Sequence, residues 1–146
     1  IYFADLLMQK RSFLEASKNY QQILQQDPKN LIALNNLAWT LHQIKDPRAL
    51  KYAEEAYAIQ PRNPAIEDTL AMLLLDAGKA ARAIELLQSA ASQAPDSPDI
   101  TFHLAQAFNK AGDREKAKTL IERVLASGKK FAEESDAREL LDQLKK

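Results

Sequence analysis

Residues 64–97 read PAIEDTLAMLLLDAGKAARAIELLQSAASQAPDS, and residues 98–130 follow the same plan as PDITFHLAQAFNKAGDREKAKTLIERVLASGKK. Both stretches begin with proline, carry Leu-Ala at their seventh and eighth positions, and have glycine at the fifteenth. On each side of the glycine, apolar residues recur three or four positions apart, which places them on one face of a helix. Each stretch therefore predicts a hairpin of two helices joined near the glycine.

The same period extends through the rest of the chain. Prolines stand in polar turns at Pro28, Pro61 and Pro95, separated by 33 and 34 residues. Two columns of alanine keep the same spacing: Ala4, Ala38, Ala71 and Ala105, and Ala16, Ala49, Ala83 and Ala117. We therefore expect one solenoid domain over residues 1–146, with repeats at about 1–30, 31–63, 64–97 and 98–130 and a final helix at 131–146. Because the chain begins with Ile1 and the first repeat lacks its opening residues, we expect a piece of a longer protein.

Turn and capping residues predict where the helices begin and end. Asn63 and Ser97 each precede a proline and are good N-caps, Gly78 and Gly112 suit the left-handed end of a helix, and Ser12 to Glu15 fits a capping box. The second repeat has Lys45-Asp46-Pro47 and no glycine, which predicts a tighter or differently capped turn. The expected helices lie near residues 1–9, 12–26, 31–44, 47–59, 64–77, 80–93, 98–110, 113–127 and 131–146.

The last predicted helix has an apolar stripe and an otherwise charged surface. Ala137, Leu140, Leu141 and Leu144 form the stripe. Such a helix suits the end of a repeat array, because the last hairpin would otherwise expose its stacking face. The alternative is that it is the first helix of a fifth repeat.

Composition removes several classes of function. Twenty basic residues balance twenty acidic ones, and the basic run from Lys110 to Lys118 is interrupted by acidic residues, so no nucleic-acid partner is expected. There is no cysteine and no apolar run of 18 residues, which argues against zinc–thiolate sites and against insertion of this segment into a membrane. The composition favours neither the cytoplasm nor the periplasm or envelope.

An enzyme is not expected. The three glycines are too scattered to form a phosphate-binding loop. His42 and His103 are the only histidines and lie two repeats apart, so neither a catalytic group nor a metal or other cofactor is predicted.

Taken together, the alanine, leucine, glycine and proline columns resemble the tetratricopeptide repeat (TPR) family. The resemblance covers nearly all of the chain up to Ser127, although Glu67 and Thr101 replace the family's large opening residue and Lys129 replaces its closing proline. It implies an all-α, right-handed superhelical solenoid of antiparallel helix pairs, with about four hairpins and a capping helix. The stretch from Asn35 to Trp39 is further similar to bacterial repeat proteins associated with the envelope or with exopolysaccharide export.

The resemblance also implies a concave groove lined by the first helix of each hairpin, which holds a peptide or helix of another protein. The expected groove residues are those that the core stripe does not use: Asn35, Asn36, Trp39, His42, Asp68, Thr69, Met72, Leu75, Asp76, Phe102, His103, Gln106 and Asn109. Trp39, Met72 and Phe102 are the predicted apolar anchors, the alternative for Trp39 being sideways packing against a neighbouring hairpin.

Charge refines the expected partner. Asp5, Asp68, Asp76 and Asp99 stand on first helices against Lys110, so a partner with apolar anchors and neutral or basic flanks is expected. Co-chaperone members of the family bind a carboxy-terminal carboxylate through lysine, asparagine and arginine on successive first helices. In the first register of that pattern only Asn36 matches, so this specificity is not expected. A homo-oligomer is the alternative, formed end to end through Ile1, Phe3, Leu6 and Leu7.

Overall fold

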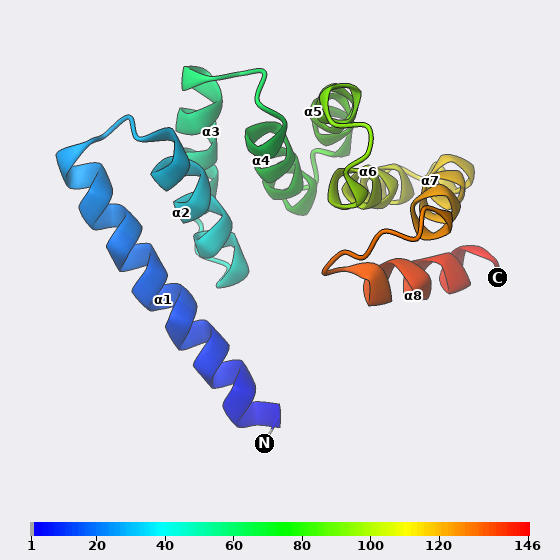
Figure 1. Ribbon diagram of the computed structural model, residues 1–146, viewed down its shortest axis with the longest axis horizontal. Coiled ribbons are helices and arrows are strands. Elements are labelled where there is room, and N and C mark those ends of the chain that lie inside the picture. Colours follow the sequence, from blue (N-terminus) through cyan, green and yellow to red (C-terminus); the bar gives the residue numbers. More distant parts are fainter. Residues whose placement is uncertain (1) are drawn as a thin grey trace. The chain divides into compact units, whose positions relative to one another are not determined.

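The computed structural model describes the backbone of residues 2–146 and the side chains of residues 10–146. Over this range the chain is an all-α helical-repeat fold of eight helices without a strand (Figure 1). The helices are α1 (Tyr2–Gln26), α2 (Leu31–Gln43), α3 (Ala49–Ile59), α4 (Pro64–Asp76), α5 (Ala80–Gln93), α6 (Pro98–Lys110), α7 (Arg114–Ala126) and α8 (Glu134–Leu144). Residues 1–73 form one compact half and residues 74–146 another, which we call the N-terminal and C-terminal halves.

The first repeat is one helix and not a hairpin. Helix α1 runs without a break for 25 residues, so the predicted turn near residues 10–11 and the predicted capping box at Ser12 are wrong. The stretch contains neither glycine nor proline, the two residues that most strongly interrupt a helix. Helix α1 therefore continues until Asp27-Pro28.

Three turns between helices share a left-handed residue and a closing hydrogen bond. Gly78 and Gly112 have φ of 82° and 91°, and Lys45 stands at the same point of its repeat with φ 58°. The prediction of a tighter turn in the second repeat is wrong, because residues 44–48 separate α2 from α3, whereas residues 77–79 and 111–113 make the later connections. The prediction of a different cap is confirmed, because Lys45 takes the left-handed conformation that glycine takes in the other repeats. Each turn is closed by the same hydrogen bond of 2.9 Å across five residues: Asp46 N to Leu41 O, Lys79 N to Leu74 O and Asp113 N to Phe108 O.

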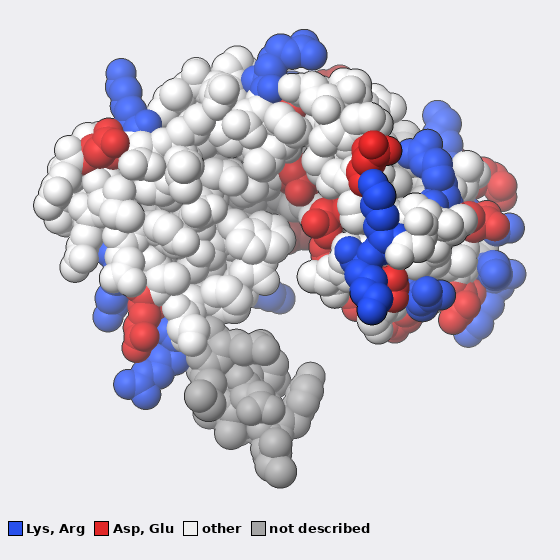
Figure 2. Space-filling view, viewed as in Figure 1, with Lys and Arg blue, Asp and Glu red and all other residues white. Residues whose placement is uncertain are grey.

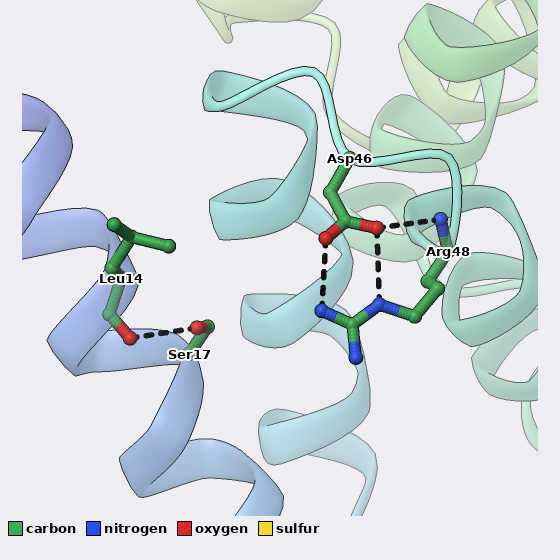
Figure 3. Close-up of polar contacts among 4 residues, drawn as sticks. All are labelled: Leu14, Ser17, Asp46 and Arg48. Carbon is green, nitrogen blue, oxygen red and sulfur yellow. Dashed lines mark hydrogen bonds and ion pairs between the residues drawn. The ribbon is translucent and has the colours of Figure 1, made fainter.

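A fork between Asp46 and Arg48 supports the turn that Lys45 begins (Figure 3). The Arg48 backbone N and Nε donate to Asp46 Oδ1 at 2.9 and 3.0 Å, and Nη2 donates to Oδ2 at 2.8 Å. The hydrogen bonds from the Arg48 side chain and backbone lower the pKa of Asp46 below its ordinary value. Figure 3 also shows Ser17 Oγ donating to Leu14 O within α1.

Capping side chains begin the first helices of the later repeats, as predicted for Asn63 and Ser97. Asn63 Oδ1 accepts from the N–H groups of Ala65 and Ile66, at 3.0 and 3.3 Å, and Ser97 Oγ accepts from Ile100 N at 3.3 Å. Asn30 caps α2 in the same way, accepting from Ala33 N at 2.9 Å.

The two alanine columns form the centre of the core from α2 onward. Ala38, Ala71, Ala83, Ala105 and Ala117 have no exposed surface, and Ala49 has almost none. In the N-terminal half, Leu34, Ala56 and Ile66 join α2, α3 and α4 in one buried cluster. Glu67 and Thr101, which replace the family's large opening residue, are buried as well.

Replacing Ala105 with leucine tests this packing. Three added carbons at a fully buried alanine should overpack the site and lower the free energy of unfolding by about 1–3 kcal/mol; Ala71→Leu should do the same. Exposed Ala81 of α5 supplies the control, since Ala81→Leu should change stability by less than about 0.5 kcal/mol. Urea denaturation measures all three, and unchanged midpoints for both core variants would contradict the assignment.

The shared turn predicts opposite effects at two equivalent positions. Lys45→Gly should raise the free energy of unfolding by up to about 1 kcal/mol, because glycine adopts positive φ without strain. Gly112→Ala should lower it by about 1 kcal/mol; a Cβ there would meet no atom within 4 Å, so the loss comes from the backbone alone. Thermal unfolding of the two variants gives the measurement, and changes of the same sign would contradict the shared conformation.

Candidate partner-binding site

Helix α2 presents an uncharged and partly apolar face in the N-terminal half. The helix, LIALNNLAWTLHQ, contains no Lys, Arg, Asp or Glu. Ile32 and Trp39 lie seven residues apart, or about two turns, and are 73% and 40% exposed. Asn36 lies between them on the same side of the helix. We call Ile32, Asn36 and Trp39 the α2 face; Figure 2 shows little charge over this helix.

Neighbouring groups extend the α2 face. The ring of His42 lies 5.7 Å from that of Trp39, measured between centroids. The Oδ1 atom of Asn35 is buried and accepts no hydrogen bond from the described protein atoms. On α4, Asp68 and Met72 are half-buried, whereas Thr69 is buried and donates its hydroxyl to Ala65 O at 3.0 Å. Of these predicted groove residues, Thr69 is therefore the one with least to offer a partner.

In the C-terminal half, three predicted groove residues are inside the protein. Leu75, Phe102 and His103 are buried, Phe102 with only 1% of its surface exposed. The Phe102 ring lies 6.1 Å from that of Phe131, and the carboxylate of Glu133 accepts a hydrogen bond from His103 Nε2 at 2.6 Å. The prediction that Phe102 is an exposed anchor is wrong, because the segment before α8 covers it.

Several polar contacts hold α8 and its preceding segment to α7 and to the turn before α6. Arg114 Nη2, at the start of α7, donates to the carbonyl oxygens of Gln143 and Leu144 at 3.3 and 3.5 Å. The Nζ atom of Lys129 donates to Asp96 O at 3.1 Å. Ala137 and Leu144 are the buried residues of α8, while most of its charged side chains are exposed. The apolar stripe predicted for the last helix thus faces the protein.

A cleft of about 200 Å³ remains between α6 and α8. Gln106 and Asn109, two predicted groove residues, are half-buried in its wall, and the Oε1 atom of Gln106 is buried without a hydrogen bond from the described protein. Asp76, also predicted for the groove, is exposed and pairs with Lys110 Nζ at 3.7 Å. The cleft is lined by Phe102, Gln106, Asn109 and Lys110 of α6 and by Asp136, Glu139, Leu140 and Gln143 of α8.

Sequence reasoning missed the α8 wall of this cleft. Asp136, Glu139, Leu140 and Gln143 recur at helical spacing, which could have identified one face of the last helix. What the spacing could not supply was the helix against which that face lies.

Neither a metal site nor a membrane span is found in the part of the chain that the structure describes. No group of three or more His, Cys, Asp or Glu residues could hold a metal ion there. None of the described helices combines the length and apolar character needed to cross a membrane.

Two family models, both described as Tetratricopeptide repeat, match residues 3–64 and 74–144. The chain belongs to the tetratricopeptide repeat family. Among curated relatives, it is 29% identical over 113 residues to a TPR repeat-containing protein of Pseudomonas aeruginosa, a match that covers 73% of this chain and 18% of the relative. It is 23% identical over 112 residues to mouse interferon-induced protein with tetratricopeptide repeats 3, covering 74% and 28%. The chain thus spans less than a third of either relative.

Solved TPR structures share the fold. A thermophilic TPR protein of Thermus thermophilus superposes with a TM-score of 0.75 at 19% identity, over 99% of this chain and 78% of that one. The MamA protein gives 0.69 at 21% identity, over 96% and 81%. YrrB, whose structure is described as that of a TPR protein with an unusual peptide-binding site, gives 0.68 at 19% identity, over 80% and 61%.

The contact between His103 and Glu133 predicts a stability effect that a neighbouring glutamate should lack. Glu133→Ala removes the acceptor of a hydrogen bond from a buried ring and should lower the free energy of unfolding by about 1–3 kcal/mol. Glu134→Ala breaks only a 3.8 Å surface pair with Arg138 and should cost less than about 0.5 kcal/mol. Chemical denaturation of both variants compares them, and equal losses would show that the Glu133 contact contributes nothing specific.

Proposed function

We propose that this TPR chain is a non-catalytic scaffold that holds an extended peptide or a helix of a partner protein against the α2 face. The TPR fold is in general that of a protein-interaction scaffold, and the proposal assigns the contact to particular residues. The observation that carries it is the exposure of Ile32 and Trp39 on a helix without charged residues. Exposed apolar groups gathered on one face are typical of interaction sites.

The chemistry of this face supports a peptide ligand with apolar anchors. Tryptophan is enriched among the residues that dominate binding energy at interfaces, and Trp39 stands next to the ring of His42. Half-buried Asn36 supplies an amide that can bond the backbone of an extended peptide. The peptide-binding site named for YrrB, a protein of the same fold, is consistent with this use of the repeats.

Charge favours a ligand with neutral or basic flanks. Helix α2 offers no lysine or arginine to an acidic ligand, and half-buried Asp68 stands on α4 in the same half of the chain. A basic flank would gain from Asp68 mainly in the rate of association, which is sensitive to salt.

Truncation of Trp39 tests the proposal. Trp39→Ala should weaken peptide binding by about tenfold or more without unfolding the array, because Trp39 is 40% exposed and lies outside the buried core. Ligands are first selected from an arrayed peptide library and then measured by calorimetry.

Ile59→Ala on α3 is the matched control. Its side chain is 44% exposed, similar to Trp39, but lies outside the α2 face, so affinity should stay within about twofold. If every selected ligand keeps its affinity for Trp39→Ala, or if the selected ligands are predominantly acidic, the assignment to the α2 face is wrong.

Self-association is a second candidate, favoured by the incomplete burial of α1. The residues first predicted for it, Ile1, Phe3, Leu6 and Leu7, lie outside the described side chains. Ile23 has 43% of its surface exposed, whereas Ala56, Ala90 and Val124, at the same point of later repeats, are buried. Because α1 does not fold back on itself, this face lacks the first helix that a complete hairpin would place on it. A second copy of the chain could cover it.

Light scattering over a concentration series tests this second candidate. The apparent mass should rise with concentration, and Ile23→Ser should reduce the rise because it removes apolar surface from the face. Leu14→Ser is the control: Leu14 is equally exposed but nine residues away, on the opposite side of the helix. A constant monomer mass, or equal effects of the two substitutions, would exclude this route to association.

A further inference from the structure

The cleft between α6 and α8 has the size of a site for a single side chain. Its volume of about 200 Å³ lies below the roughly 300–1,000 Å³ that is typical of small-molecule sites. Phe102 and Leu140 supply apolar atoms from its two walls. An aliphatic stem could pack between them while its polar end meets the remaining groups.

The remaining groups are two carboxylates, three amides and one lysine. Gln106 Oε1 is buried and receives no hydrogen bond from the described protein. Burial of an unpaired acceptor costs free energy, which a hydrogen-bond donor from a ligand would offset. Asp136 and Glu139 supply two exposed carboxylates, and neither forms an ion pair with another described residue. The one cation in the lining, Lys110, is paired with Asp76.

From this arrangement we infer that the cleft between α6 and α8 receives an arginine side chain of a protein partner. The inference rests on the proposed function, because it names a side chain that a protein partner of a TPR scaffold would carry. Arginine fits because its stem is aliphatic and its guanidinium carries five N–H donors for the acceptors of the lining, the carboxylates of Asp136 and Glu139 above all. An acidic side chain would instead meet two carboxylates and a third acceptor.

The test uses the full 146-residue chain and three synthetic probes that differ in one side chain. The probes are acetyl-Leu-Arg-Leu-amide, the same peptide with citrulline for arginine, and the same peptide with glutamate. Citrulline keeps the shape of arginine but lacks its charge. Binding is followed by two-dimensional NMR of labelled protein, with the side-chain amide of Gln106 and the methyl groups of Leu140 as reporters.

The arginine probe should cause saturable shifts at both reporters, and the citrulline and glutamate probes should bind at least about fivefold more weakly. The double variant Asp136→Asn, Glu139→Gln should lose at least about fivefold in affinity for the arginine probe. Glu122→Gln, which neutralises an exposed carboxylate of α7 outside the cleft, should bind as the parent does. Raising the salt concentration should weaken the arginine probe alone.

Three results would overturn the inference: equal binding of arginine and citrulline probes, an unchanged affinity of the double variant, or shifts that spare Gln106 and Leu140. Its failure can be told from failure of the proposed function. Trp39 lies in the other half of the chain, so Trp39→Ala should leave the tripeptide shifts at Gln106 intact. If Trp39→Ala no longer binds the library ligands but the cleft shows no preference for arginine, the α2 face remains the assigned peptide site. The inference about the cleft is then wrong.

Discussion

Close approach of helices at buried alanines is the constraint on which the rest of this structure depends. Ala38 and Ala105 lie on first helices, Ala49 and Ala117 on second helices, and all four are essentially without exposed surface. A larger side chain at these points would hold the helices apart, because a packed interior has little free volume. The residues at the helix ends fix the length of each helix that packs in this way. A capping side chain such as Asn63 begins a first helix, and a left-handed residue such as Gly112 follows the end of one.

Once the alanine faces are buried, the remaining faces of the first helices determine what the chain can contact. On α2, this remaining face carries Ile32 and Trp39 and stays open. On α6, the positions equivalent to Ile32, Asn36 and Trp39 are Asp99, His103 and Gln106, and His103 among them is buried and bonded to Glu133. The position of Asn36 therefore belongs to the proposed interface, whereas the equivalent His103 makes an internal contact. What differs is that the segment between α7 and α8 packs on this face of α6.

The bounds of α2 to α7 could be predicted to within about two residues because proline, glycine and asparagine mark them locally. The break predicted in α1 was wrong, since a repeat period alone does not end a helix when no residue in the stretch disfavours it. Lys45 shows the reverse case: the closing hydrogen bond between Asp46 and Leu41 is kept although its residue type predicted another turn. A local sequence pattern predicts helix ends well where a residue type itself fixes the backbone conformation. It predicts them poorly where the surrounding structure fixes that conformation.

The candidate site was harder to predict for the same reason. Exposure of Phe102 depends on Phe131, which is 29 residues away in sequence and has no counterpart in the repeat period. Periodicity identifies which face of a helix is free of the core stripe, but it cannot say whether a later segment will cover that face. For the same reason, the burial of Gln106 could not be predicted from the repeat period. Its side chain lines a face that α8 covers incompletely, so its oxygen is removed from water without gaining a donor. A covering segment that leaves an acceptor unpaired beside two carboxylates creates a preference for a cation, although the chain as a whole has no net charge.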